Sequence, residues 1–260
     1  MLLECLQGID FCHSTCSRNG LIFSKLNEVE LLQSYYFNNV PYLNNILRLK
    51  SNKKYLSMSE KRLYQNAFLE RLAQTKPLFA IRLYIFIAVA IYTYGFLMIK
   101  AVLLQKLIFF LLGILFYTLI EYIFHRFLYH SGEDYKDAKN WQYKIHGIHH
   151  VLPKDERLLA MPIPLAILLG SVLFLLVYLL MGTKAWFFFP GLFLGYAIYL
   201  LIHYNVHANK PPNNFLKYLW KHHLIHHYTH EDKAFGVSSP LWDIIFRTMP
   251  PKRERKGKVG

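Results

Sequence analysis

The stretch VLLQKLIFFLLGILFYTLIEYIFHRFLYH, residues 102–130, joins an apolar run of membrane length directly to two histidines. A helix of about 20 residues spans a hydrocarbon core about 30 Å thick, and Val102–Phe124 is long enough to do so. No helix-breaking residue separates this run from His125, so the helix is expected to extend beyond the bilayer and to end near Ser131-Gly132. The stretch therefore predicts a membrane helix that carries candidate metal ligands at its end.

Three further apolar stretches have membrane length, near Leu78–Ile99, Leu158–Met181 and Trp186–Ile202. A hydrophobic fraction of 54% is typical of an integral membrane protein rather than of a soluble domain. The links between the first and second stretches, and between the third and fourth, are only a few residues long. The sequence predicts an all-α integral membrane fold with four transmembrane helices in two hairpins.

The formal net charge of +14 is unevenly distributed along the chain. Basic residues are concentrated in the N-terminal segment, in the loop after the second span and in the C-terminal tail, whereas the opposite side has Lys100, Lys106 and Lys184. The positive-inside rule then places both termini and the central loop in the cytosol. The membrane would be the inner membrane of a bacterium or the endoplasmic reticulum of a eukaryote. Topology and anionic lipids explain the charge better than nucleic-acid binding.

The chain is expected to divide into a cytosolic or interfacial segment at 1–76, a membrane domain at 77–249 and a basic tail at 250–260. Ser57 and Glu60 have capping-box spacing, which predicts an amphipathic helix that lies on the membrane surface or packs on the cytosolic part. No secretory signal peptide is predicted. The three cysteines near the start are interpreted as free thiols, with half of a zinc site as the alternative.

Ten of the thirteen histidines fall into four short clusters. The clusters are His125 and His130; His146, His149 and His150; His203 and His207; and His223, His226 and His227. Neutral imidazole is the commonest metal-ligating side chain. Ten imidazoles are too many for one ion and suit two ions with about five ligands each. Isolated His13, and His222 and His230 beside the last cluster, are excluded as ligands.

Helical geometry gives an expectation for each cluster. Residues three and four apart share a helix face, so each His-x-x-His-His triplet is expected to converge, as are His203 and His207. Five residues on a 3.6-residue helix place His125 and His130 about 140° apart. These two would reach different ions, or one ion if the helix end is irregular. Imidazole suits zinc, copper, iron and nickel, so ligand type leaves the metal open.

At these clusters the chain resembles the fatty acid hydroxylase/sterol desaturase superfamily, and most closely its fatty acid 2-hydroxylase branch. The resemblance extends from about Pro77 to Met249. It is carried by residues 121–130, by 146–150 with Pro153 and Asp155, by Arg157-Leu158 before Pro162, by 222–228, by Phe235-Gly236-Val237 and by Leu241-Trp242-Asp243.

The resemblance implies four membrane helices under a cytosolic helical cap that holds a dimetal site. It implies an oxidoreductase that uses O2 and two electrons to hydroxylate the alpha (C2) carbon of a fatty acyl chain, commonly for sphingolipids. The ligands and catalytic residues would then be His125, His130, His146, His149, His150, His203, His207, His223, His226 and His227. Iron is expected for activity, and zinc can occupy the same ligands.

Two features depart from the pattern that the resemblance implies. Residues 1–76 are too short for a cytochrome b5 domain and lack a His-Pro-Gly-Gly motif, so electrons are expected from a separate donor such as a cytochrome b5-type protein or a ferredoxin. Leu200 and Ile202 stand where the family often has Asp and Thr, which leaves His203 without an orienting carboxylate. Glu121 and Asp243 are candidates for such orienting contacts, although Glu121 could instead cap a helix or pair with Arg126.

Three alternatives remain open at this stage. Another reaction of the same superfamily, such as sterol desaturation, sterol C-4 methyl oxidation or carotenoid hydroxylation, would use the same histidines. A histidine-rich metal transporter would place its ligands near the bilayer midplane, whereas these lie at helix ends. A membrane scaffold with structural zinc would need the histidines for folding alone.

Overall fold

A computed structural model of the protein describes residues 63–132, 136–137 and 140–251. The chain divides into two compact units, Met1–Ser59 and Glu60–Gly260, and every described residue belongs to the second unit. The predictions on the cysteines and on the capping box at Ser57 and Glu60 lie outside the described residues. The prediction on the basic tail does so as well, from residue 252 onward.

Every regular element among the described residues is helical, which confirms the predicted all-α class. The long helices are α5 (Pro77–Met98), α6 (Leu103–Ile123), α8 (Ile163–Met181) and α9 (Ala185–Ala208), and the short ones are α4 (Ala67–Ala73), α7 (Ile148–Val151), α10 (Lys217–Tyr228) and α11 (Leu241–Ile245). Two π-helical turns, η2 (Phe124–Tyr129) and η3 (Tyr143–Gly147), and two 3₁₀ turns, η4 (Glu156–Leu158) and η5 (Gly182–Lys184), interrupt them.

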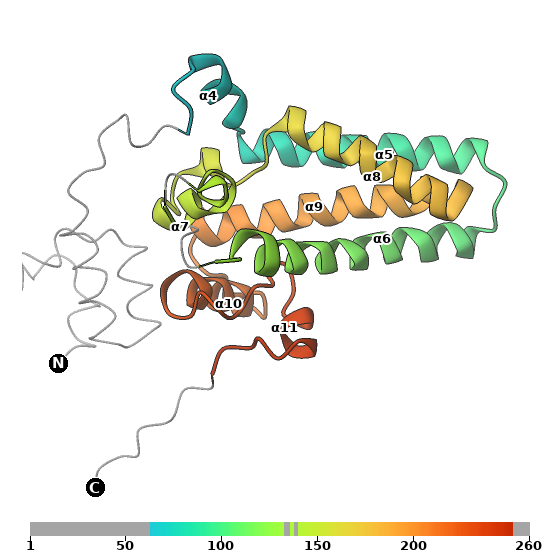
Figure 1. Ribbon diagram of the computed structural model, residues 1–260. Helices are drawn as coiled ribbons and strands as arrows, with labels where there is room; N and C mark the ends of the chain where they lie inside the picture. Colours follow the sequence, from blue (N-terminus) through green and yellow to red (C-terminus); the bar gives the residue numbers. More distant parts are fainter. Residues whose placement is uncertain (1–62, 133–135, 138–139, 252–260) are drawn as a thin grey trace, which may run out of the picture. The chain divides into compact units, whose positions relative to one another are not determined.

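Helix α9 lies between α5 and α6 and packs along both (Figure 1). Glycines let α6 and α9 approach until their backbones touch. A Cβ atom added to Gly113 would lie 2.0 Å from the carbonyl oxygen of Phe188, and one added to Gly191 would lie 2.1 Å from that of Phe110. Small residues are typical of such close crossings in membranes, because helices there associate mainly by packing. The crossing fixes the relative position of the two helices that carry His125 and His203.

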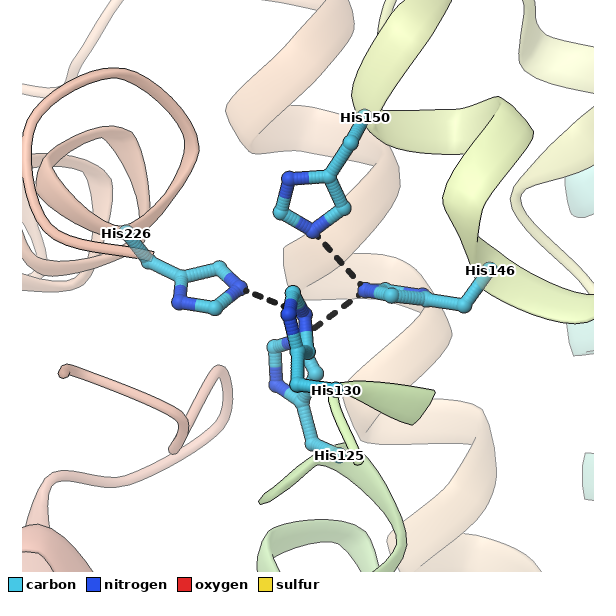
Figure 2. A group of neighbouring side chains, drawn as sticks. All are labelled: His125, His130, His146, His150 and His226. Carbon is cyan, nitrogen blue, oxygen red and sulfur yellow. Dashed lines mark hydrogen bonds between the residues drawn. The ribbon is translucent and has the colours of Figure 1, made fainter. Parts of the chain in front are cut away.

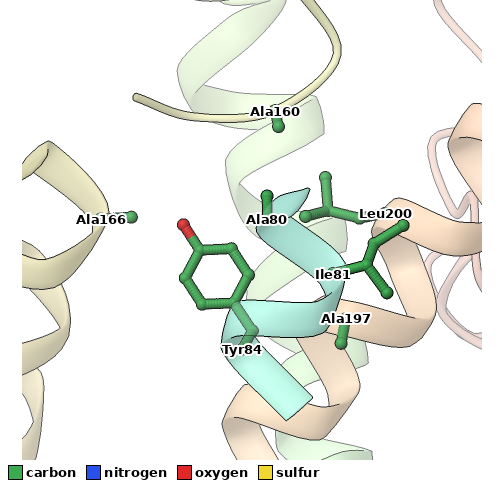
Figure 3. Packing of buried hydrophobic residues seen from close by; sticks show 7 residues of the cluster. All are labelled: Ala80, Ile81, Tyr84, Ala160, Ala166, Ala197 and Leu200. Atoms are coloured by element: carbon green, nitrogen blue, oxygen red, sulfur yellow. The ribbon is translucent and has the colours of Figure 1, made fainter. Parts of the chain in front are cut away.

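A cluster of buried apolar side chains joins α5, α8 and α9 (Figure 3). Tyr84 of α5 is fully buried beside Ala166 of α8 and Ala197 of α9. Small alanines around one large ring allow the three helices to pack closely. Leu200 completes the cluster and is 1% exposed. Leu200, which stands near the place where the resemblance would put an Asp, is therefore part of the apolar core.

Lys106 is a buried cation at the hairpin between α5 and α6. Its ammonium donates a hydrogen bond to the carbonyl oxygen of Phe96, 3.0 Å away, and lies 4.0 Å from the centre of the Phe96 ring. The carbonyls in the last turn of a helix lack helical partners and carry partial negative charge, so this contact caps the C-terminus of α5. Lys106 therefore stabilises the turn opposite the histidine clusters.

Three helical stretches are long and apolar enough to cross a membrane: Pro77–Met98, Leu103–Tyr129 and Glu156–Ala208. The third has 53 residues and contains both α8 and α9, joined by η5. Helix α8 begins at Ile163 rather than at the predicted Leu158, because η4 and Pro162 precede it and Pro164 fits only the first helical turn. The outer faces of the long helices carry large exposed apolar side chains, such as Leu180 of α8, which is 84% exposed. Such a surface suits hydrocarbon rather than water.

The predicted surface helix is shorter than expected. A helix was predicted to follow Ser57 and Glu60, but α4 begins at Ala67, where the Asn66 side chain accepts hydrogen bonds from the amides of Phe68 and Leu69. Glu70 accepts the amides of Leu63 and Tyr64 and thereby holds them outside the helix. The helix starts at the Asn66 N-cap rather than at the capping box predicted from Ser57 and Glu60, since asparagine is among the best N-cap residues.

Candidate metal centre

The ten predicted histidines lie together in two groups of five at one end of the long helices. In each group, one ring nitrogen of every histidine lies within 4.8 Å of the others. The first group contains His125, His130, His146, His150 and His226 (Figure 2), and the second contains His149, His203, His207, His223 and His227. The structure thus brings all ten together, and their binding of metal stays a prediction.

The prediction that each triplet converges on one point is wrong. His146 and His150 belong to the first group, whereas His149, between them in the sequence, belongs to the second. His223 and His227 belong to the second group and His226 to the first. Successive residues on an α-helix are rotated by about 100°, so the member at i+3 diverges from the pair at i and i+4.

His125 and His130 reach the same group because the end of α6 is irregular. Residues Phe124–Tyr129 form a π-helical turn, in which hydrogen bonds join residues five apart. The 140° separation expected on an α-helix therefore does not apply. The sequence left open whether His125 and His130 would reach different ions or one, and the structure places both in the same group.

The Nε2 atoms face the centre of each group. In the first group the Nε2 atom of His146 lies 3.1 Å from that of His125 and 3.0 Å from that of His150. In the second, the Nε2 atom of His149 lies 2.9 Å from that of His203 and 3.1 Å from that of His227. Two nitrogens bound about 2.1 Å from one ion at a right angle are about 3.0 Å apart, against about 3.4 Å at a tetrahedral angle. The spacing fits an ion with five or six ligands.

Burial keeps these imidazoles neutral. His149 is 1% exposed, and His223 and His226 are fully buried. Desolvation, followed by the proximity of other histidines, holds the pKa values of all three well below the usual value. Burial likewise lowers the pKa of His130 to about 2. A metal ligand must present an unprotonated nitrogen, so the environment favours the form that binds metal at neutral pH.

Two buried carboxylates hold the segment that follows α10. Glu121 accepts hydrogen bonds from the backbone amides of Val237 and Ser238, at 2.6 and 2.9 Å. Asp243 accepts those of Phe235 and Gly236, at 2.9 and 2.8 Å. The sequence had suggested that Glu121 or Asp243 orients a ligating histidine, but neither carboxylate contacts one of the ten histidines directly. Both act on the backbone of a segment that contacts the first group.

His222, which the sequence excluded as a ligand, is buried and donates a hydrogen bond to Asp243, 3.0 Å away. Arg126 donates to the hydroxyl of Tyr122, 2.8 Å away, rather than forming the expected alternative pair with Glu121. The segment at Phe235–Val237 was visible in the sequence only as part of the resemblance. No spacing rule links it to Glu121, more than 100 residues earlier.

Comparison with known proteins gives a family for this site. The model of the fatty acid hydroxylase family matches residues 110–248, which include all ten histidines, Glu121 and Asp243. The solved structure of full-length scs7p, with only its hydroxylase domain visible, is 32% identical and has a TM-score of 0.63, covering 71% of this chain and 70% of that one. The chain belongs to the fatty acid hydroxylase family.

Several relatives of the chain are named 2-hydroxylases. A dihydroceramide fatty acyl 2-hydroxylase of Arabidopsis thaliana is 40% identical over 139 residues, 53% of this chain and 59% of the plant protein. A fatty acid 2-hydroxylase of Mus musculus is 36% identical over 151 residues, 55% of this chain and 40% of the mouse protein. The chain thus spans about half the length of the curated relatives it matches.

Proposed function

We propose that this fatty acid hydroxylase family member is a membrane-bound dimetal enzyme that hydroxylates the alpha carbon of a fatty acyl chain, for sphingolipid synthesis. The observation that carries the proposal is the pair of five-histidine groups, whose neighbouring Nε2 atoms are 2.9–3.1 Å apart beside helices of membrane length. The names of the relatives supply the substrate class.

The ten histidines would hold two metal ions, iron for activity or zinc in the same positions. Bound iron would supply activation of O2, which an all-nitrogen ligand set supports. The balanced reaction takes one O2, two electrons and two protons, places one oxygen atom in a new C–OH bond in place of C–H, and releases the other as water. The electrons would come from a separate donor, such as a cytochrome b5-type protein or a ferredoxin.

We further propose four membrane spans, α5, α6, α8 and α9, within a membrane domain at 77–249. Residues 1–76 and 250–260 would flank it as the cytosolic or interfacial segment and the basic tail. The histidine groups, both termini and the helical cap would face the cytosol, at the bacterial inner membrane or the endoplasmic reticulum. The basic residues at the histidine end support this orientation.

An open pocket reaches the first group and offers a place for the polar head of the acyl substrate. Its lining includes His130, the guanidinium side chain of Arg126 and the rings of Phe127 and Phe235. Phe127 is 56% exposed, so the pocket presents an apolar ring at its edge, beside the end of α6. An acyl chain could then lie along hydrocarbon while Arg126 binds a polar carbonyl or hydroxyl beside the metal site.

The test is lipid mass spectrometry on cells that express the protein under ¹⁸O2. We expect new 2-hydroxy acyl sphingolipids that carry one labelled oxygen, with none from the His149→Ala variant. His230→Ala, the same substitution outside both groups, is the control and should retain the product. Absence of 2-hydroxy species with altered sterols would refute acyl hydroxylation and favour a sterol reaction. A hydroxyl derived from water would refute oxygen activation altogether.

A further inference from the structure

The two histidine groups differ in what holds their outer ring nitrogens. In the first group, Nδ1 of His125 lies 2.5 Å from the carbonyl oxygen of Phe235, and Nδ1 of His226 lies 2.9 Å from that of Lys233. A carbonyl only accepts hydrogen bonds, so both rings carry their proton on Nδ1. The Nε2 atom of each then presents its lone pair to the centre of the group.

In the second group, four of the five rings show no such contact with the part of the chain that the structure describes. The Nδ1 atoms of His149, His203, His223 and His227 are buried and have no hydrogen-bond partner among the residues that the structure describes. A metal-bound histidine ordinarily donates its other N–H to a carbonyl or carboxylate, which fixes its tautomer and ring orientation. Four of the five rings in this group therefore have no hydrogen bond on the outer nitrogen that would fix their tautomer.

The carbonyls that support the first group belong to residues 233–238, the clamp segment. Glu121 and Asp243 accept four successive backbone amides from this segment, from Phe235 to Ser238. Asp243 is fully buried and also accepts the Thr248 hydroxyl, 2.7 Å away. These contacts hold the backbone at Phe235, whose carbonyl accepts from His125, through the protein's own side chains.

We propose that Glu121 and Asp243 are positioning residues for the first histidine group, and that this group therefore holds its metal ion more tightly than the second. The inference rests on the proposed dimetal site. An ion entering the first group meets two rings, those of His125 and His226, already in the binding orientation and tautomer, whereas four of the five rings of the second group must be ordered as the ion binds. Contacts of this kind change metal affinity by about 10- to 100-fold.

The two carboxylates respond differently to conversion into amides. Both oxygens of Asp243 accept a backbone amide, Phe235 on Oδ1 and Gly236 on Oδ2, so the NH2 group in Asp243→Asn must face a donor that cannot turn round. In Glu121, a single oxygen, Oε1, accepts both backbone amides, and Oε2 contacts only the Ser238 hydroxyl. A hydroxyl can rotate to accept, so Glu121→Gln should preserve the clamp.

The test measures release of zinc from the zinc-loaded protein in detergent after addition of a chelator, with ions counted by native mass spectrometry. We expect two ions per chain and two phases of release, separated by about 10- to 100-fold in rate. His149→Ala should remove the fast phase and His146→Ala the slow one. Asp243→Asn should bring the slow phase close to the fast one, whereas Glu121→Gln should leave both in place.

Lys106→Met is the control for a general loss of stability, because Lys106 lies on α6 fifteen residues before Glu121, about 22 Å along the helix. It should leave both phases of zinc release unchanged. Release of two ions in a single phase, or an unchanged slow phase in Asp243→Asn, would overturn the inference while leaving the dimetal site standing. Binding of fewer than two ions by the wild-type protein would instead overturn the dimetal site itself.

Discussion

The close crossing of α6 and α9 gives the sharpest prediction for stability. A Cβ atom on Gly113 would lie 2.0 Å from the Phe188 carbonyl oxygen, more than 1 Å inside normal contact, and both partners are backbone. The helices must separate in Gly113→Ala, and overpacking of this kind costs about 1–3 kcal/mol. The substitution also gains about 1 kcal/mol of helix propensity, which obscures the cost if the variant is studied alone.

Gly170→Ala is the matched control for Gly113→Ala. Gly170 lies inside α8, and its added Cβ would lie 3.1 Å from the Phe193 ring edge, which can tilt away. Both variants gain the same helix propensity, so their difference isolates the crossing. In thermal unfolding in detergent, Gly113→Ala should be less stable by about 1–3 kcal/mol, or about 2–4 °C per kcal/mol. Equal stability of the two variants would refute the backbone contact.

Three other results are expected. Lys106→Met should lower the free energy of unfolding by about 1–3 kcal/mol, because the Phe96 carbonyl loses a charged donor; a thermal midpoint equal to wild type would contradict this. Gly236→Ala should disrupt the clamp segment and speed zinc release from the first group, since its Cβ would lie 2.1 Å from the Ser239 carbonyl; unchanged release would count against the geometry. The metal-free protein should lose stability as pH falls below about 6.5, because His223 and His226 bind protons in the unfolded chain but not when they are buried in the folded one. Below that pH, each histidine lowers the free energy of unfolding by about 1.4 kcal/mol per pH unit. A free energy of unfolding that is the same at pH values of about 7.5 and 5.5 would refute this prediction.

The helices were predictable because their signals are local. Apolar runs of membrane length located α5, α6, α8 and α9, although the predicted start of α8 at Leu158 was five residues too early. The histidine clusters were visible for the same reason. Histidines three to five residues apart stand out as clusters in the sequence, so spacing selected the ten side chains that the structure brings together, although it did not predict how they divide between the two groups.

The support of the site was not predictable, because it depends on contacts between distant parts of the chain. Glu121 accepts the amide of Val237, which follows it by 116 residues. A buried carboxylate that binds backbone amides leaves no periodic pattern in the segment it holds. The same holds for the π-helical turn at Phe124–Tyr129, whose sequence is compatible with a continued α-helix. Both the Glu121 contacts and the π-helical turn depend on the folded environment, which cannot be read from local patterns in one sequence.

The division of the triplets between the groups has a consequence for how the two proposed ions are linked. In each triplet the members at i and i+4 serve one group and the member at i+3 serves the other. His149 thus ties α7 to the second group, and His226 ties α10 to the first. A rotation of either helix that improves one group must disturb the other, since both sets of rings are fixed to the same backbone. The clamp segment contacts His226, so the order that it imposes on the first group also limits the rotation of α10, and with it the positions of His223 and His227 in the second.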